Sequence, residues 1–385
     1  MSETAVPADA APMRLYDTAR QAVVPFEPGE LVTMYTCGIT PYDATHFGHA
    51  ATYLTYDVLQ RRLRDRGHDT RCVRNITDVD DDLLRKAREL GVHYLDLAAG
   101  EIARFDEDMD ALEMLPSWSE PRATSAIADI RGFIGMVLDR GHAYESGGSV
   151  YFDVGSWKRF GEISHYDRDE MLRLAAIHGG NPDDPNKRDP LDFVLWQPSA
   201  PDEPFWESLW GPGRPGWHIE CSALAMRELG TTIDLHGGGS DLVFPHHECE
   251  TAQSEAATGE PFVRHWMHQA MVRMDGEKMS KSLGNLVFVS ELRKEWDTRA
   301  IRLAAVANHY RTPWEWHDEI MPQAAARLDA WTAAGQGDGA LDEVRAALDE
   351  DLDTPAAVAA IDRAAAAGRG VSAAAALLGV DLTRS

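Results

Sequence analysis

Three residues with metal-binding side chains, Cys37, Cys221 and His246, lie in separate segments of this 385-residue chain. Each falls near the predicted end of a strand or the predicted start of a helix, and such positions meet at the carboxyl edge of a doubly wound sheet. Two thiolates and an imidazole suit zinc, and three protein ligands leave one coordination position open. These residues therefore predict a zinc site, unless they are three buried residues with no common role.

Two side chains next to His246 bear on this predicted zinc site. Glu250 follows His246 by four residues on a predicted helix, so both side chains can face the same point. Glu250 could be a fourth ligand or a carboxylate that orients a ligand. Cys249 occupies the adjacent helical position and is predicted to point elsewhere. Cys72, which belongs to no such group, is predicted to be a buried thiol of a strand.

Two other segments have the chemistry of phosphate binding. His46 and His49 flank Gly48 where a predicted strand and its loop lead into a helix, so backbone amides and two imidazoles can meet an anion. Lys278 and Lys281 lie in a Lys-Met-Ser-Lys-Ser loop and can neutralise a leaving pyrophosphate. Either segment alone could be an exposed loop with no function. Their occurrence together, in this order, favours an enzyme that uses ATP.

A glycine run in the second half of the chain is a further candidate for nucleotide binding. Residues 237–239 are glycines, and they follow a predicted strand at 232–235. Such a run lets the backbone approach a nucleotide closely, and Asp241 could accept hydrogen bonds from ribose hydroxyls. The same run could equally be a simple turn.

The elements that position these residues predict an α/β fold. Residues 31–37 and 70–75 read as strands, and 50–63 and 80–90 read as helices. A strand, a helix and a second strand at this spacing form a βαβ unit, so the sheet is expected to be parallel. We expect a tail at 1–28, a catalytic sheet domain at 29–93 and 214–288, a helical and mixed insertion at 94–213, and a helical C-terminal domain at 289–385. The insertion is expected to contain a hairpin that turns at Gly147 and Gly148, and Thr354 is expected to cap a helix of the C-terminal domain.

Composition excludes several classes of protein. The net charge is −26, from 37 basic and 63 acidic residues, which argues against a polyanion as the main substrate. No apolar run reaches the roughly 20 residues of a membrane helix. The N-terminus lacks the basic and apolar parts of a signal peptide, so a cytoplasmic location is expected. Four cysteines are too few for a disulfide scaffold of this length.

These segments together resemble the class I aminoacyl-tRNA synthetases. His46–His49 and Lys278–Ser282 are similar to the two signatures of that family, whose catalytic sheet is Rossmann-like. The segments around Cys37, Cys221 and His246 narrow the resemblance to the cysteinyl-tRNA synthetase group, over about residues 34–285. The resemblance implies a zinc ion that binds the substrate thiol directly. Serine would be a poorer ligand, so editing would be unnecessary.

Several features depart from the synthetases. Residues 283–385 are mostly alanine-rich helix without a basic stripe, where a synthetase continues into an anticodon-binding domain. Ile39 stands where synthetases usually carry proline, and Ala51 where they commonly carry arginine. This pattern is similar to the cysteine:glucosaminyl-inositol ligases of mycothiol biosynthesis. Glu250 is instead a synthetase-like feature.

The resemblance implies a reaction in two halves. Cysteine reacts with ATP, which is expected to carry Mg²⁺, to give cysteinyl-adenylate and pyrophosphate, and the amine of glucosaminyl-inositol then displaces AMP. We expect a monomer that acts on these small molecules, with no membrane and no nucleic acid as partner. Two alternatives stay open: a compact cysteinyl-tRNA synthetase that charges tRNA, and a non-catalytic zinc-binding regulator. The intact histidines and lysines argue against the regulator.

The resemblance also assigns residues to roles. The catalytic residues are expected to be His46, His49, Lys278 and Lys281. The zinc ligands are expected to be Cys37, Cys221 and His246. The adenylate pocket is expected to be lined by Cys37, Gly38, Ile39, Thr40, Thr52, Asn75, Ile76, Thr77, Trp217, Gly239, Ser240, Asp241 and Val272.

Overall fold

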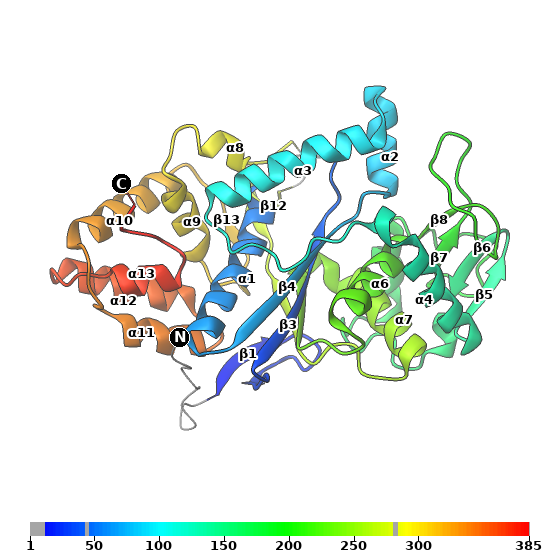
Figure 1. Cartoon of the computed structure of the whole chain (residues 1–385), viewed down its shortest axis with the longest axis horizontal. Helices are drawn as coiled ribbons and strands as arrows, with labels where there is room; N and C mark the ends of the chain where they lie inside the picture. The colour runs from blue at the N-terminus through cyan, green and yellow to red at the C-terminus, as the bar shows by residue number, and fades with distance from the viewer. Residues whose placement is uncertain (1–11, 43–45, 280–283, 385) are drawn as a thin grey trace.

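The computed structural model describes residues 12–42, 46–279 and 284–384. A parallel sheet lies at the centre of the molecule, with C-terminal helices at one end and a second, antiparallel sheet at the other (Figure 1). Among the described residues, no helix is long and apolar enough to cross a membrane.

The central sheet has four parallel strands in the order β10-β9-β3-β4. They are β3 (Leu31–Ile39), β4 (Asp69–Ile76), β9 (Leu235–Gly239) and β10 (Trp266–Gln269). Helix α1 (Phe47–Asp65) joins β3 to β4, and it buries Ala50, Leu54 and Val58 at four-residue spacing along one face. The predicted βαβ unit and parallel sheet are confirmed.

Strand β9 corrects the prediction for the glycine run. The strand was expected at residues 232–235, but it runs from Leu235 to Gly239 and contains the three glycines. A Cβ at Gly237 would collide with the hydroxyl of Tyr56 on α1. That hydroxyl donates to the carbonyl oxygen of Met267 at 2.7 Å and accepts from the amide of Gly238 at 2.7 Å. The glycines therefore let a helix pack closely on the sheet, which outweighs their low strand propensity.

The region between β4 and α6 (Trp217–Leu229) holds helices and a separate antiparallel sheet, of order β5-β6-β7-β8. Its helices are α2 (Asp81–Leu90), α3 (Tyr94–Ala111), α4 (Ile127–Asp139) and α5 (Arg168–Ile177). Its strands are β5 (Ala143–Ser146), β6 (Ser149–Phe152), β7 (Phe193–Gln197) and β8 (Arg214–Pro215). The hairpin predicted at Gly147 and Gly148 is confirmed, and both glycines have positive φ angles.

The N-terminal segment is ordered over part of the expected tail. Residues 13–26 form an antiparallel hairpin of β1 (Met13–Asp17) and β2 (Ala22–Phe26). The side chains of Met13, Leu15 and Phe26 are buried, so the hairpin joins the core and the tail expectation does not hold for these residues. The division of the chain at residues 93, 213 and 288 stays a prediction.

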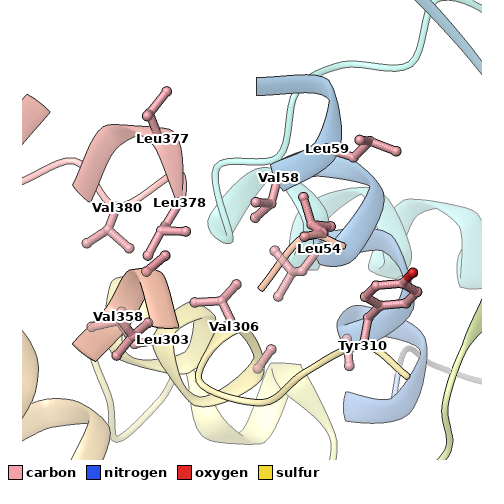
Figure 2. Close-up of a cluster of buried hydrophobic side chains, with 14 of the residues drawn as sticks. Leu54, Val58, Leu59, Leu303, Val306, Tyr310, Val358, Leu377, Leu378 and Val380 are labelled. Atoms are coloured by element: carbon pink, nitrogen blue, oxygen red, sulfur yellow. The ribbon is translucent and has the colours of Figure 1, made fainter. Parts of the chain in front are cut away.

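The C-terminal helices share a core with α1. They are α8 (Val289–Leu292), α9 (Thr298–Val306), α10 (Ile320–Ala334), α11 (Leu341–Asp349), α12 (Thr354–Ala366) and α13 (Ser372–Leu377). Figure 2 shows Leu54 and Val58 of α1 facing the cluster that contains Val306 and Leu378. The cap of α12 differs from expectation: the carboxylate of Asp353, rather than Thr354, accepts from a backbone amide of the first turn.

A buried ion pair joins these helices to α1. Asp57 on α1 and Arg302 on α9 are 0% and 1% exposed, and their side chains form an ion pair. Arg302 also donates to the carbonyl oxygens of Leu378, at 2.6 Å, and Leu112, at 2.9 Å. Arg61 adds a second cation at 2.8 Å from the Asp57 carboxylate. Removing one partner of such a pair leaves an unpaired charge buried in the core.

Asp57→Ala is therefore expected to lower the free energy of unfolding by about 3–5 kcal/mol. Urea unfolding followed by tryptophan fluorescence measures the change. Glu343→Gln is the matched control, because Glu343 pairs with Arg363 at 2.9 Å while both side chains are more than half exposed. The control is expected to cost at most about 0.5 kcal/mol. Equal losses in the two variants would contradict a special contribution of the buried pair.

Candidate metal and adenylate site

The structure brings the three predicted zinc ligands together with Glu250. One possible ligand atom from each of Cys37, Cys221, His246 and Glu250 lies within 4.8 Å of the others, and all four residues are buried. Cys37 comes from β3 near its carboxyl end, and Cys221 from the first turns of α6 (Trp217–Leu229). His246 precedes α7 (Glu248–Thr258), which carries Glu250. Elements that are far apart in sequence thus converge at one edge of the sheet.

The imidazole of His246 is held from two sides. Its Nδ1 lies 2.8 Å from Nδ1 of His218, and the ring of Trp217 stacks on it with centroids 4.0 Å apart. Its Nε2 lies 3.5 Å from Oε2 of Glu250 and makes no hydrogen bond with any described residue. When Nδ1 carries the ring proton and donates it to His218, Nε2 has the lone pair that a metal ligand requires.

A second set of ligand atoms overlaps the first. Cys37 and Glu250 also lie within 4.8 Å of nitrogen atoms of His236 and His247. Nε2 of His247 is 3.3 Å from Sγ of Cys37, and Nε2 of His236 is 3.3 Å from Oε1 of Glu250. On its other side, His247 hydrogen-bonds His268 at 2.7 Å. Sequence reasoning missed these three histidines, and the only signal was their position at strand ends and beside His246.

Burial decides the charge state of these groups. It lowers the pKa of His218, His236 and His268 to about 3, so the imidazoles are neutral and keep a lone pair. Burial also raises the pKa of the Cys37 thiol and of the Glu250 carboxyl. A divalent cation would reverse the preference of these acids and favour their charged forms. Two sulfurs, an imidazole and a carboxylate fit such a cation, and soft ligands of this kind suit zinc.

The other two cysteines lie outside this cluster. Cys249 belongs to neither set of ligand atoms among the described residues, although it is buried beside Glu250. Cys72 is a buried thiol on β4, with Sγ 3.9 Å from the hydroxyl of Thr36. Both positions agree with the sequence predictions.

The first phosphate segment lies at the start of α1. His46 is the N-cap residue of the helix, and its ring centroid is 3.7 Å from that of His49. A Cβ at Gly48 would lie 2.9 Å from Cε1 of His46, so glycine allows the two rings to approach. Lys278 ends the short strand β12 (Glu277–Lys278). Lys281 lies outside the described residues.

Four of the residues predicted for the adenylate pocket, Gly38, Ile39, Asn75 and Thr77, lie at or directly after the carboxyl ends of β3 and β4. The amide of Gly38 donates to Oδ1 of Asn75 at 2.8 Å, and a Cβ at Gly38 would collide with the Asn75 carbonyl. Nδ2 of Asn75 donates to the hydroxyl of Thr77 at 3.0 Å, and the amide of Thr77 donates to the carbonyl of Ile39. This network fixes the ends of β3 and β4 against each other.

The remaining predicted residues lie on neighbouring elements. Ile76 pairs with Ile39 across β3 and β4, and the hydroxyl of Thr52 donates to the Gly48 carbonyl at 3.1 Å. Gly239 ends β9, and Ser240 and Asp241 form the short helical turn after it. Thr40 follows β3, and Val272 is buried on β11 (Val272–Met274), which pairs with β12 and β13 (Trp314–Glu315).

Comparison with known proteins identifies the fold class of this chain. Residues 23–326 match the family described as tRNA synthetases class I (C) catalytic domain. The structure resembles Mycobacterium tuberculosis methionyl-tRNA synthetase in complex with methionyl-adenylate, with a TM-score of 0.67, 18% identity, and coverage of 87% of this chain and 82% of that one. It also resembles a leucyl-tRNA synthetase ternary complex from Agrobacterium radiobacter K84, with a TM-score of 0.64 and 12% identity. This match covers 92% of this chain and 83% of that one. The molecule therefore has the class I synthetase fold.

Two similar proteins identify the family within this fold class. L-cysteine:1D-myo-inositol 2-amino-2-deoxy-alpha-D-glucopyranoside ligase from Thermobispora bispora is 51% identical, over 94% of this chain and 92% of its own length. The protein of the same name from Nocardiopsis dassonvillei is 50% identical, over 93% of this chain and 89% of its own length. The chain belongs to this family of ligases.

Proposed function

We propose that this enzyme joins L-cysteine to the amine of 1D-myo-inositol 2-amino-2-deoxy-alpha-D-glucopyranoside at the expense of ATP. The observation that carries the proposal is about half-identity to ligases of that name over more than nine-tenths of the chain. The buried cluster of thiols, imidazole and carboxylate supports cysteine as the amino acid. The substrates are small molecules, and we propose that the enzyme acts as a monomer without nucleic acid.

The reaction has two balanced steps. A carboxylate oxygen of cysteine forms a bond to the α-phosphorus of ATP, and the bond to pyrophosphate breaks. The neutral amine nitrogen of the acceptor then forms a bond to the carbonyl carbon of cysteinyl-adenylate, AMP leaves, and the nitrogen gives up a proton. The leaving group is a stable anion in both steps, pyrophosphate in the first and AMP in the second. Positioning and charge stabilisation are therefore the main contributions of the protein.

We infer that Cys37, Cys221 and His246 hold a zinc ion, with Glu250 as a fourth donor or as an orienting carboxylate. When bound, zinc would supply a soft Lewis acid that prefers the thiol of cysteine to the hydroxyl of serine. Trp217 and His218 fix the ring of His246 in the required orientation. The neutral form of that imidazole follows from its burial, which lowers its pKa far below the usual value.

The phosphates of ATP are expected at the start of α1. There the backbone amide of Gly48 and the imidazoles of His46 and His49 can donate to phosphate oxygens, whereas the amide of Phe47 already donates to the Val287 carbonyl at 2.7 Å. Lys278 and Lys281 are expected to neutralise the charge that develops on pyrophosphate as it leaves. The turn at 240–242, directly after β9, supports a place for the ribose beside Asp241.

The proposal predicts the identity of the acceptor. Purified enzyme with ATP and cysteine is expected to release AMP on repeated turnover when the amino-sugar inositol is added, and not when cysteine tRNA is added. The turnover with the amino sugar should change little between 50 and 200 mM salt, whereas tRNA charging would fall steeply. A coupled AMP assay measures both. Charging of tRNA without turnover of the amino sugar would overturn the proposal.

A further inference from the structure

A short segment of the C-terminal region, residues 314–316, lies beside the hairpin that leads to Lys278. We call β11, β12 and the turn between them the lysine hairpin, since β11 and β12 pair in antiparallel fashion and β12 ends at Lys278. Strand β13 pairs in parallel with β11, so that Glu315 lies opposite Arg273. The amide of Trp316 also donates to the carbonyl oxygen of Arg273, at 2.8 Å. The reaction above assigns this segment no role.

The carboxylate of Glu315 holds the turn of the lysine hairpin. Its Oε1 accepts from the backbone amide of Gly276 at 2.7 Å. The central residues of the turn, Asp275 and Gly276, have φ angles of 56° and 81°. Positive φ at both central residues is the geometry of a tight two-residue hairpin turn, and a residue with a side chain adopts it less readily than glycine does. The hydrogen bond from outside the hairpin therefore stabilises the turn in this conformation.

The tryptophans of the same segment pack against the start of α1. Phe47, the first residue of that helix, is fully buried. Its ring centroid is 4.6 Å from that of Trp316 and 5.9 Å from that of Trp314. Aromatic pairs at these distances stabilise a contact beyond the apolar area that they bury. Residues 314–316 thus contact both segments that are proposed to bind the phosphates of ATP.

We infer that Glu315 is a positioning residue for the attack of cysteine on ATP. It ties the lysine hairpin to a segment that is itself packed on the start of α1, so the two phosphate-binding segments keep a fixed separation. Both segments must meet one triphosphate at the same time, and a displacement of about 1 Å can lower a rate by 100-fold. Glu315 acts through the backbone of the turn. Because the contact needs only an acceptor oxygen, a glutamine should replace this glutamate.

This inference rests on the proposed function, and pyrophosphate exchange tests the two separately. The parent enzyme, Glu315→Ala and Glu315→Gln are compared in cysteine-dependent exchange, and cysteine affinity is measured by equilibrium binding without ATP. Glu319→Ala is the matched control, because Glu319 is an exposed glutamate of the next few residues that pairs with His317 at 3.0 Å. Glu315 is also exposed, so its replacement should leave the fold intact, and thermal unfolding of each variant checks this.

Glu315→Ala is expected to lower kcat/KM for ATP by about three- to tenfold, the size of one lost hydrogen bond. Its affinity for cysteine should stay at the parent value, and Glu315→Gln and Glu319→Ala should behave like the parent in both measurements. A parent-like kcat/KM for ATP in Glu315→Ala would overturn the inference and leave the proposed function standing. Equal losses in Glu315→Ala and Glu315→Gln would also overturn it, because a charge and not an acceptor oxygen would then be required. A parent enzyme without cysteine-dependent exchange would overturn the proposed function and the inference with it.

Discussion

Cys221→Ala is expected to remove most of the zinc from the enzyme and to slow cysteine-dependent pyrophosphate exchange by about 100-fold or more. The thiol of Cys221 is one of only four groups whose ligand atoms lie within 4.8 Å of one another in the first ligand set. A methyl group cannot replace a thiolate, and the remaining donors would hold the cation more weakly and with a wrong geometry. Elemental analysis of the purified protein gives the zinc content, and exchange of labelled pyrophosphate into ATP gives the rate.

Cys249→Ala is the matched control for Cys221→Ala. It removes a second buried thiol, which adjoins Glu250 in sequence but belongs to neither ligand set among the described residues. The control is expected to keep its zinc and its exchange rate. Glu250→Gln in the same series distinguishes a fourth ligand, whose loss would lower zinc content, from a carboxylate that only orients its neighbours. Full zinc content together with full activity in Cys221→Ala would exclude Cys221 as a ligand.

The parts of the fold that local sequence specifies were predicted correctly. Strand β3, helix α1 and strand β4 follow from apolar periodicity, and the hairpin at Gly147 follows from turn chemistry. Strand β9 was placed too early because glycine disfavours strands. Its real position depends on the hydroxyl of Tyr56, which comes from a distant part of the chain and tolerates no side chain at Gly237. No local pattern contains that contact.

The residues of the candidate site also fall into two groups, those that local sequence predicts and those that only the fold brings together. Cys37, Cys221 and His246 lie in short segments with recognisable chemistry, and the structure places them together as expected. His236 carries no local signature, since a lone histidine on a strand usually serves packing. It joins the cluster only because its strand, β9, pairs with β3, the strand that carries Cys37. Residues of this kind become visible only when the sheet order is known.

Lys281→Ala is expected to slow cysteine-dependent pyrophosphate exchange by about 100-fold or more. The expectation comes from the Lys-Met-Ser-Lys-Ser loop, whose second lysine lies outside the described residues. In the proposed mechanism the cation stabilises charge that develops on pyrophosphate in the transition state, so its loss should lower the rate constant. The proposed place for cysteine is the thiol and imidazole cluster, so the affinity for cysteine should change much less. Lys294→Ala is the control, because Lys294 is an exposed lysine that pairs with Glu291 at 2.7 Å. Equal losses of exchange rate and cysteine affinity in Lys281→Ala would contradict a role confined to the leaving group.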